Sequence, residues 1–539
     1  MSVNVKKLLV VLVFVLIFFI VIVPSIYFII SYAGRISPDS VLPDSFIAYM
    51  HIPNPMRTAK NLLAHHPMQM WVSRFGENDG YEVKANGIQT CDCCSPAFMR
   101  LEVPKKRWMR FIGRGSLDGV LLSDGKFLAA WDSGILASAF IRFFPRIAAR
   151  QLAIPNLRYV RAGKWFEYRG FDNIVLYMRS YKNLLLVSND LSVLGKAASN
   201  AKFAEPGRER TFYAPAGKIC CSGRAADAWF VVASEPLAEG FTGSGPIADA
   251  FLEHLNFGEF AKLTLSILPE RLDVSLVSSI ASNNASIDRL ISRDSKLTTL
   301  MQHLPANTQF SSVFSIGSIE ELLNASLAVY MPKTPINLRR VDSTARLFFG
   351  TSLNESLYSW SGTEIAVLVL EDNHVPVFVL QIADEQQRRE IFEKVFAASA
   401  AAGVVQGLGG TRISRISLPG FLNVVLGVWN IRFSTPHYIV QNDFLFLSES
   451  PEALLSVNNS IYENKLLSNS ALWKSFAPLD FDESSLTLFY SLDGAVPFFI
   501  RGNDSFEAVL GLYRQALIWI NISNNILAAN LSVVSDEPW

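Results

Sequence analysis

The hydrophobic pattern of the chain begins with an unbroken apolar run. Residues 8–30 carry no charged side chain. A helix of this length is roughly 34 Å long, more than the about 30 Å hydrocarbon core of a bilayer. Lys6 and Lys7 precede the run, and acidic residues follow it from Asp39 onwards. The positive-inside rule therefore predicts a cytoplasmic tail at residues 1–7 and a transmembrane signal-anchor helix at 8–30. We expect a single pass through the inner (cytoplasmic) membrane, with the rest of the chain in the periplasm.

A cleaved signal peptide is the alternative interpretation of the same run. Ser31 and Ala33 are small residues at the −3 and −1 positions of a possible cleavage site. The run is longer than the roughly 7–15 apolar residues usual in a signal peptide, which favours an uncleaved anchor. Cleavage would release the protein from the membrane, and the sequence leaves this alternative open.

Beyond residue 40, strand-like and helical patterns recur in the second half of the chain, about 250–260 residues later. Each half opens with Leu-Pro, at Leu42 and Leu304, and continues with an alternating run typical of a strand. Three further blocks recur in the same order: paired strands with a helix, a hairpin with a helix, and a terminal hairpin. The recurring runs lie at 46–52 and 310–316, 119–152 and 364–402, 184–199 and 444–459, and 263–279 and 518–535. In the second of these pairs the long helices are expected at 135–152 and 385–402. Asp190 and Ser450 are the expected N-caps of the helix in the hairpin-and-helix block.

This mixture of antiparallel strands and amphipathic helices predicts an α+β fold. We expect an N-terminal transmembrane helix followed by two tandem homologous repeats of mainly antiparallel sheet with amphipathic helices. The first repeat is expected at 42–282 and the second at 301–539. The Ser-, Asn- and Asp-rich stretch 283–300 is expected to link them.

Composition narrows the classes of partner. Half of the 539 residues are apolar and only 18 % are charged, which supplies large cores and argues against long disordered segments. Lys plus Arg equals Asp plus Glu, at 48 each. Proteins that bind nucleic acid normally carry a basic excess, so we expect no nucleic-acid partner. The neutral balance also gives no sign of attraction to anionic lipid.

Five cysteines form two clusters in the first half of the chain. In an oxidising compartment, disulfides between the clusters are the expected state, closing a loop worth roughly 4–5 kcal/mol on the chain-entropy model. Thiolates could instead hold zinc or copper(I), with imidazoles from a neighbouring histidine pair as further ligands. Free, structurally inert thiols are the third alternative. The disulfide candidates are Cys91, Cys93, Cys94, Cys220 and Cys221, and the metal candidates are the same residues with His65 and His66. No cofactor motif is present, and we expect no cofactor.

One motif invites a catalytic interpretation. Asp132-Ser133-Gly134 follows an apolar run and resembles the Asp-Ser/Thr-Gly loop of aspartic proteases, which use one such Asp from each of two lobes. The matching position in the second half is Ala383-Asp384-Glu385, which has neither the hydroxyl residue nor the glycine. Both Asp132 and Asp384 fit helix N-caps, and that interpretation is favoured. We identify no catalytic residue.

The chain resembles a widespread group of uncharacterised, single-span, membrane-anchored bacterial envelope (periplasmic) proteins. The resemblance is carried by Leu42-Pro43, by Tyr-Met-His-Ile-Pro-Asn-Pro at 49–55, and by the blocks at 185–190 and 446–455. It implies an envelope location and transfers no catalytic residue.

These observations favour a membrane-anchored, extracytoplasmic protein without enzymatic activity. Its duplicated repeats are expected to bind another envelope protein or an apolar, lipid-like ligand. Two alternatives stay open: a thiol-based metal-binding or redox protein, and a hydrolase with a cleft between the repeats.

Overall fold

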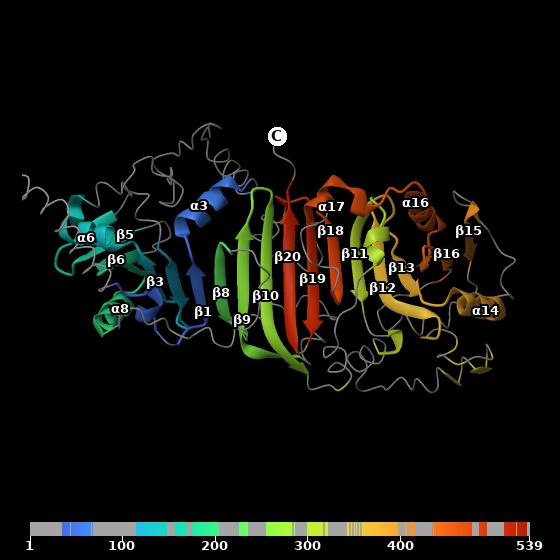
Figure 1. Ribbon diagram of the computed structural model, residues 1–539, viewed down its shortest axis with the longest axis horizontal. Helices are drawn as coiled ribbons and strands as arrows, with labels where there is room; N and C mark the ends of the chain where they lie inside the picture. The colour runs from blue at the N-terminus through green and yellow to red at the C-terminus, as the bar shows by residue number, and fades with distance from the viewer. Residues whose placement is uncertain are drawn as a thin grey trace, which may run out of the picture. The chain divides into compact units, whose positions relative to one another are not determined.

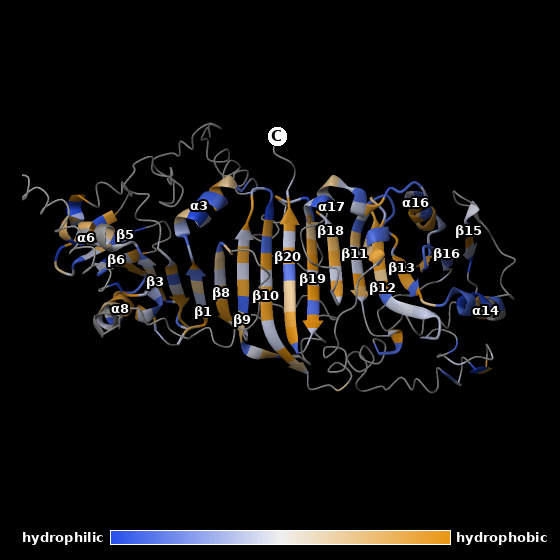
Figure 2. Cartoon of the chain, viewed as in Figure 1, coloured by the Kyte–Doolittle hydropathy of each residue, from blue (hydrophilic) through white to orange (hydrophobic). Residues whose placement is uncertain are grey.

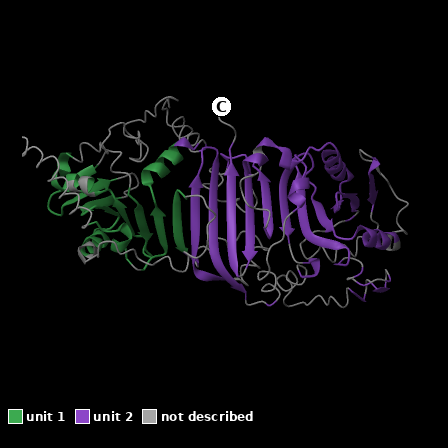
Figure 3. Ribbon diagram, viewed as in Figure 1, with its two compact units in different colours: residues 1–63, 72–232 green, residues 64–71, 233–539 purple. Residues whose placement is uncertain are grey.

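The architecture is taken from a computed structural model of the chain. The described residues are 35–43, 45–65, 67, 115–147, 157–169, 175–203, 226–234, 255–282, 285, 299–315, 318–321, 342–343, 346–347, 350, 352, 355, 358–396, 405–406, 410–415, 434, 436–476, 484–492, 511–523 and 525–535. They form two compact units, residues 1–63 with 72–232 and residues 64–71 with 233–539 (Figure 3). The two units are described separately below.

The first unit is built on an antiparallel sheet. Its strands follow the order β4-β5-β6-β7-β3-β2-β1-β8, and each neighbouring pair is antiparallel (Figure 1). The bounds are β1 Ala48–Ile52, β2 Leu117–Leu121, β3 Phe127–Asp132, β4 Leu157–Val160, β5 Trp165–Arg169, β6 Val175–Tyr181, β7 Leu184–Ser188 and β8 Ala228–Ala233. Helices α3 Pro55–Ala64, α6 Ile135–Phe143 and α8 Leu191–Phe203, with the short turn η2 Pro38–Val41, complete the described part of this unit.

The second unit is built on a longer antiparallel sheet. The order is β9-β10-β20-β19-β18-β11-β12-β13-β17-β16-β15-β14. The strand bounds are β9 Leu255–Ile267, β10 Arg271–Ser282, β11 Thr308–Ser315, β12 Ser361–Leu370, β13 Val377–Ile382, β14 Val405–Gln406, β15 Arg412–Arg415, β16 His437–Gln441, β17 Phe444–Ser448, β18 Leu486–Ser491, β19 Gln515–Ser523 and β20 Ile526–Val534. Its described helices are η4 Leu300–His303, α14 Glu385–Phe396, α16 Pro451–Tyr462, η8 Leu467–Asn469 and α17 Ala471–Phe476.

The predicted fold class is wrong in two respects. No helix in the ranges given above is long and apolar enough to cross a membrane, which contradicts the transmembrane signal anchor and its single pass. The longest helix there, α8, has 13 residues and therefore a length of about 20 Å, short of a bilayer core of about 30 Å. Residues 8–30 themselves lie outside the described residues.

The second correction concerns the architecture of the sheet. We expected two tandem α+β repeats, but extended antiparallel sheet dominates the described structure, with a few short helices beside it. The hairpin β9–β10, expected to end the first repeat, belongs to the second unit, where β10 pairs with β20 from Arg271↔Val534 to Ser279↔Ile526. The cause lies outside the local sequence: β10 and β20 are long strands, and pairing their edges satisfies the backbone hydrogen-bonding groups of both. The boundaries proposed at 283–300 stay a prediction, since most of that stretch lies outside the described residues.

Strand pairings in the first half recur in the second. The pairs β1–β2, β1–β8, β2–β3, β3–β7 and β6–β7 correspond to β11–β12, β11–β18, β12–β13, β13–β17 and β16–β17. Ser188 and Ser448 fix the alignment, because each is buried and donates to a carbonyl next to its partner on the neighbouring strand, of Phe127 and Pro376 respectively. Positions in the two halves can therefore be compared residue by residue.

The main core lies in the second unit. Buried side chains from the sheet meet those of α16 and α17, among them Phe446, Leu454 and Phe476. Apolar positions colour much of β18, β19 and β20 in Figure 2. The alternation along these strands follows from the period of two of a strand, which places every second side chain on the core face.

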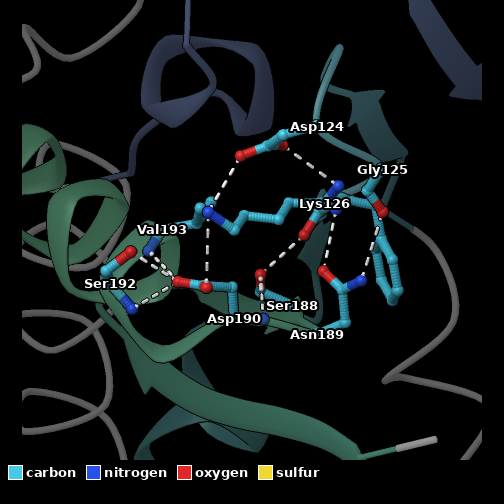
Figure 4. Close-up of polar contacts among 9 residues, drawn as sticks. Asp124, Gly125, Lys126, Ser188, Asn189, Asp190, Ser192 and Val193 are labelled. Atoms are coloured by element: carbon cyan, nitrogen blue, oxygen red, sulfur yellow. Dashed lines mark hydrogen bonds and ion pairs between the residues drawn. The ribbon is translucent and has the colours of Figure 1, made fainter.

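A polar cluster fixes the start of α8 in the first unit (Figure 4). The carboxylate of Asp190 accepts from the backbone N–H of Ser192 at 2.7 Å and of Val193 at 3.1 Å, which confirms the predicted N-cap. Lys126 lies in the β2–β3 turn, and its Nζ is 3.7 Å from Oδ2 of Asp190 and 2.8 Å from Oδ2 of Asp124. In the second half Ser450 accepts from the N–H of Ala453 at 3.0 Å, so that predicted cap is also confirmed.

Removing either cap is expected to destabilise its own helix by about 1 kcal/mol. The Ser192 hydroxyl and the Val193 N–H lower the pKa of Asp190 from 3.8 to about 2. A depressed carboxylate pKa stabilises the fold above the unfolded value and loses that contribution as pH falls from about 3.8 towards about 2. The free energy of urea unfolding of Asp190→Ala should therefore be lower than that of wild type at pH 7, and the difference should be much smaller near pH 2. Ser450→Ala is the matched control, because its hydroxyl does not titrate. An equal pH dependence in both variants would contradict this account.

Candidate functional site

Most of the predicted thiol and metal site cannot be placed. All five cysteines, together with His66, lie outside the described residues. His65 is described and buried, with 3 % of its surface exposed. No group of three or more His, Cys, Asp or Glu side chains within the described ranges is arranged to hold a metal ion. The disulfide and metal hypotheses therefore stay predictions.

His65 itself has partners on both ring nitrogens. Its Nδ1 lies 2.6 Å from the carbonyl oxygen of Leu268, so Nδ1 carries the proton and donates. Its Nε2 lies 2.9 Å from the hydroxyl of Tyr513. Burial raises the pKa of Tyr513 to about 12, so this hydroxyl keeps its proton and donates to Nε2. This geometry makes His65 a structural link inside the second unit rather than a ready metal ligand.

Asp132 is fully engaged in structural bonds. Its carboxylate accepts from Arg35 Nε at 2.8 Å, from Asn183 Nδ2 at 3.0 Å and from Gly134 N–H at 3.1 Å. The N-cap of α6 is Gly134, so the cap prediction for Asp132 is wrong. It is confirmed for Asp384, which accepts from the N–H of Gln387 at 2.9 Å at the start of α14.

No second aspartate of the protease type matches Asp132. In the strand register Asp132 lies opposite Leu184, and the corresponding residue in the second half, opposite Phe444, is Gln381. An amide cannot share a proton between two carboxylates as aspartic proteases require. The contacts of Asp132 are therefore structural, although it is not the predicted helix cap.

A row of three polar and aromatic side chains crosses β2, β1 and β8. Asp118, His51 and Trp229 are directly opposed in the strand register. His51 Nδ1 lies 2.7 Å from Asp118 Oδ1, and the His51 ring lies 4.9 Å from that of Trp229. Asp118 also accepts from Tyr49 on the same strand as His51 and from Ser116. Asp118 is 2 % exposed, so the carboxylate is buried with its donors.

This row has one feature of a catalytic pair, a buried carboxylate that orients a histidine. The nearby hydroxyl of Ser116 is not the third group, because it donates to Asp118 and not to His51. The second half has no such pair, since Val313 and Ala366 occupy the corresponding opposed positions. Sequence analysis missed this cluster, because residues 51 and 118 meet only through strand pairing.

Helix α6 is held against the sheet by one face. Ala137, Ser138 and Ile141 are buried, and Ile141 packs with Phe166 of β5. The hydroxyls of Ser138 and Ser180 lie 2.5 Å apart, which joins the helix to β6. These contacts fix the direction in which the last turn of the helix presents its side chains.

The end of α6 presents apolar side chains to solvent. Phe143 is 71 % exposed, Phe144 53 % and Ile147 49 %. The helix ends at Phe143, because Pro145 disfavours helical backbone in the residue before it. Single exposed apolar residues are ordinary, whereas three within five residues form an apolar patch and make this a candidate contact surface.

Arginines stand among these apolar side chains. Arg142 and Arg146 are exposed, and the Arg142 guanidinium lies 5.9 Å from the centre of the Phe143 ring, within cation–π range. We call these five residues the α6 surface: Arg142, Phe143, Phe144, Arg146 and Ile147. Sequence analysis expected one helix through 135–152 and missed this surface. Pro145 and a charge count over a short window were the available signals.

Comparisons with known proteins add little to this geometry. No family model matches the sequence, and no curated protein matches it significantly. Five chains of solved structures match. Crystal form III of TP0453 is 11 % identical, with a TM-score of 0.27, over 48 % of this chain and 89 % of that chain. Crystal form I of TP0453 is 13 % identical, with a TM-score of 0.25, over 48 % and 84 %. The chain is thus similar to TP0453 over about half its length, at a level that carries no argument about activity or ligand.

Proposed function

We propose that this protein is a binding protein without catalytic chemistry, and that it holds an apolar partner on the α6 surface. The observation that supports the proposal is the exposure of Phe143, Phe144 and Ile147 at and just beyond the end of α6, whose other face is anchored to the sheet. The anchored helix presents Phe143, and holds the start of the segment with Phe144 and Ile147, at little further cost in conformational entropy.

The apolar side chains of this surface would contribute measurably to binding. Full burial of one such side chain is worth about 1.5–3 kcal/mol. The three are already partly buried, so their transfer out of water contributes about 3–4 kcal/mol in total. That corresponds to a factor of about a few hundred in affinity, since about 1.4 kcal/mol is tenfold.

The competing functions have weaker support in the described residues. A hydrolase would use His51 and Asp118, but its nucleophile is not found in the described part of the chain. A thiol-based site depends on cysteines outside it. The extracytoplasmic location also stays a proposal, tested by protease accessibility in intact cells.

Binding of an apolar partner can be tested with a local label. We expect an alkyl diazirine probe dissolved in dodecyl maltoside micelles to label the peptide 140–147 strongly after irradiation. Replacing the two rings, Phe143→Ser with Phe144→Ser, should lower that label at least tenfold, because it removes most of the exposed apolar area. Mass spectrometry of peptic peptides from the full chain measures the yield.

The matched control is Leu347→Ser. Leu347 is 80 % exposed, so its loss removes a comparable apolar side chain elsewhere. It should leave the label at 140–147 unchanged. Equal labelling of 140–147 in wild type and in the double Phe variant would reject the proposed function.

A further inference from the structure

The α6 surface combines apolar side chains with guanidinium groups, and this combination limits what can cover it. Phe143, Phe144 and Ile147 favour an apolar medium, whereas Arg142 and Arg146 require hydration or an anion. A bilayer with anionic headgroups supplies both, because rings enter the boundary of the acyl chains while phosphates pair with arginines. We propose that the partner of the α6 surface is an anionic lipid bilayer; this rests on the proposed binding function of the same surface.

The local charge supports this choice, although the whole chain is neutral. Between Asp132 and Glu167 the sequence contains no acidic residue and six basic ones: Arg142, Arg146, Arg150, Arg158, Arg161 and Lys164. A basic segment gains about fivefold in binding to an anionic leaflet for each arginine or lysine at the surface. The zero net charge of the chain therefore conceals a strongly positive segment that begins at α6.

The two acidic residues that border this segment do not offset it at the α6 surface. Asp132 is 5 % exposed and bonded to Arg35. Glu167 accepts from Arg169 at 2.8 Å and lies 3.4 Å from Arg158, and the Arg169 hydrogen bond is the largest cause that lowers the pKa of Glu167. Each bordering carboxylate thus already has its own guanidinium partner.

The Glu167 cluster also lies on the other face of the sheet from α6. Leu157, Tyr159 and Phe166 pack with Ile141 of α6, and successive strand residues point to opposite faces. Glu167 follows Phe166, so it and its partners face away from the helix. This placement makes Arg169 a suitable control for charge alone.

A second copy of this chain is a less suitable partner. A two-fold interface would bring the same patch on both copies together, and so would oppose Arg142 and Arg146 to their own copies. Like charges in such a contact are unfavourable. A lipid leaflet has the opposite sign of charge and no such conflict.

The test uses the full-length chain with vesicles of phosphatidylcholine, with or without about a third phosphatidylglycerol. Trace phospholipid with a diazirine in its acyl chain labels what enters the bilayer, and peptic peptide 140–147 is quantified by mass spectrometry. We expect strong labelling with phosphatidylglycerol and little without it. Arg142→Gln with Arg146→Gln should lower the label about thirtyfold, and 1 M salt should lower it also. Arg169→Gln, which removes one charge from the opposite face, should change it less than twofold.

The outcomes separate this inference from the proposed function. Equal labelling on neutral and anionic vesicles, or no effect of the arginine variants, would overturn the anionic-lipid inference and leave apolar binding intact. Absence of label from either vesicle, with strong label from micelles, would overturn it also and indicate a protein partner. A self-association that sedimentation shows to be lost in the double Phe variant would identify a second copy. Absence of label at 140–147 when the wild type is irradiated in micelles would reject the proposed function itself.

Discussion

Replacing Asp118 with alanine is expected to destabilise the strands around β1 by about 3 kcal/mol. The buried carboxylate accepts from His51, Tyr49 and Ser116. Without this acceptor the donors stay buried and lose their hydrogen bonds, which carries the full cost of their desolvation. Hydrogen exchange of peptides covering 46–52 and 117–132 in the full chain measures the local opening free energy. The exchange of β9–β20 peptides should change little, because those strands belong to the other unit.

The second half of the chain supplies a matched control for this variant. Where the first half has His51 opposite Asp118, the second has Val313 opposite Ala366, both fully buried. The double variant His51→Val with Asp118→Ala copies that apolar pair. It should recover part of the loss, because it removes the His51 donor together with its acceptor, while the Tyr49 and Ser116 hydroxyls still lose their bonds to Asp118. A loss below about 1 kcal/mol for Asp118→Ala alone would show that the carboxylate is not the shared acceptor.

The same double variant bears on function. If the row served catalysis, its loss would abolish an activity. If the row is structural, the chain with the double variant should fold and should be labelled normally at 140–147. The proposed binding surface shares no residue with the row. We therefore expect lipid labelling to survive His51→Val with Asp118→Ala.

Local features of the fold were predictable from the sequence. Alternation at 46–52 and 310–316 predicted strands close to β1 Ala48–Ile52 and β11 Thr308–Ser315. The helix caps Asp190, Ser450 and Asp384 were predicted from residue type and position, and their hydrogen bonds confirm them. Such features are local, because the chemistry that forms them lies within a few residues.

Features that depend on distant partners were not predictable. Alternation tells which face of a strand is buried but not which edge it joins, so the pairing of β10 with β20 was missed. The same limit applies to the Asp118–His51 pair, which strand register alone brings together. The chemistry of a cross-strand row is therefore visible only once pairing is known.

The α6 surface was missed for a different reason. Charge was counted over the whole chain, where basic and acidic residues cancel. The apolar pattern over 135–152 also indicates one helix with a buried face, whereas α6 ends at Phe143. Whether Phe143 and Phe144 are buried depends on what lies opposite them, and hydropathy contains no such information.

Replacing Glu364 with alanine is expected to destabilise the second unit by about 3 kcal/mol or more. The Glu364 carboxylate is 1 % exposed and accepts from the N–H and hydroxyl of Thr299 at 2.9 and 2.7 Å and from the N–H of Leu300 at 2.8 Å. Charge-assisted hydrogen bonds of this kind contribute about 1.5–3 kcal/mol each. They hold the start of η4, whose residues Leu300 and Met301 enter the main core. Hydrogen exchange of peptides covering β11 and β12 measures the loss.

The first half again provides a comparison. A link in the first half uses an amide in place of the carboxylate: Ile36 N–H donates to Asn183 Oδ1 at 2.9 Å, and Asn183 Nδ2 lies 2.9 Å from the Ile36 carbonyl and 3.0 Å from the Asp132 carboxylate. Because one of these three bonds goes to a carboxylate, Asn183→Ala should cost about as much as Glu364→Ala, about 3 kcal/mol, and the amide variant of Glu364 decides the cause. Glu364→Gln keeps the shape and one acceptor oxygen, and should fall between wild type and Glu364→Ala. If Glu364→Gln were as stable as wild type, shape rather than charge would fix η4 against the sheet.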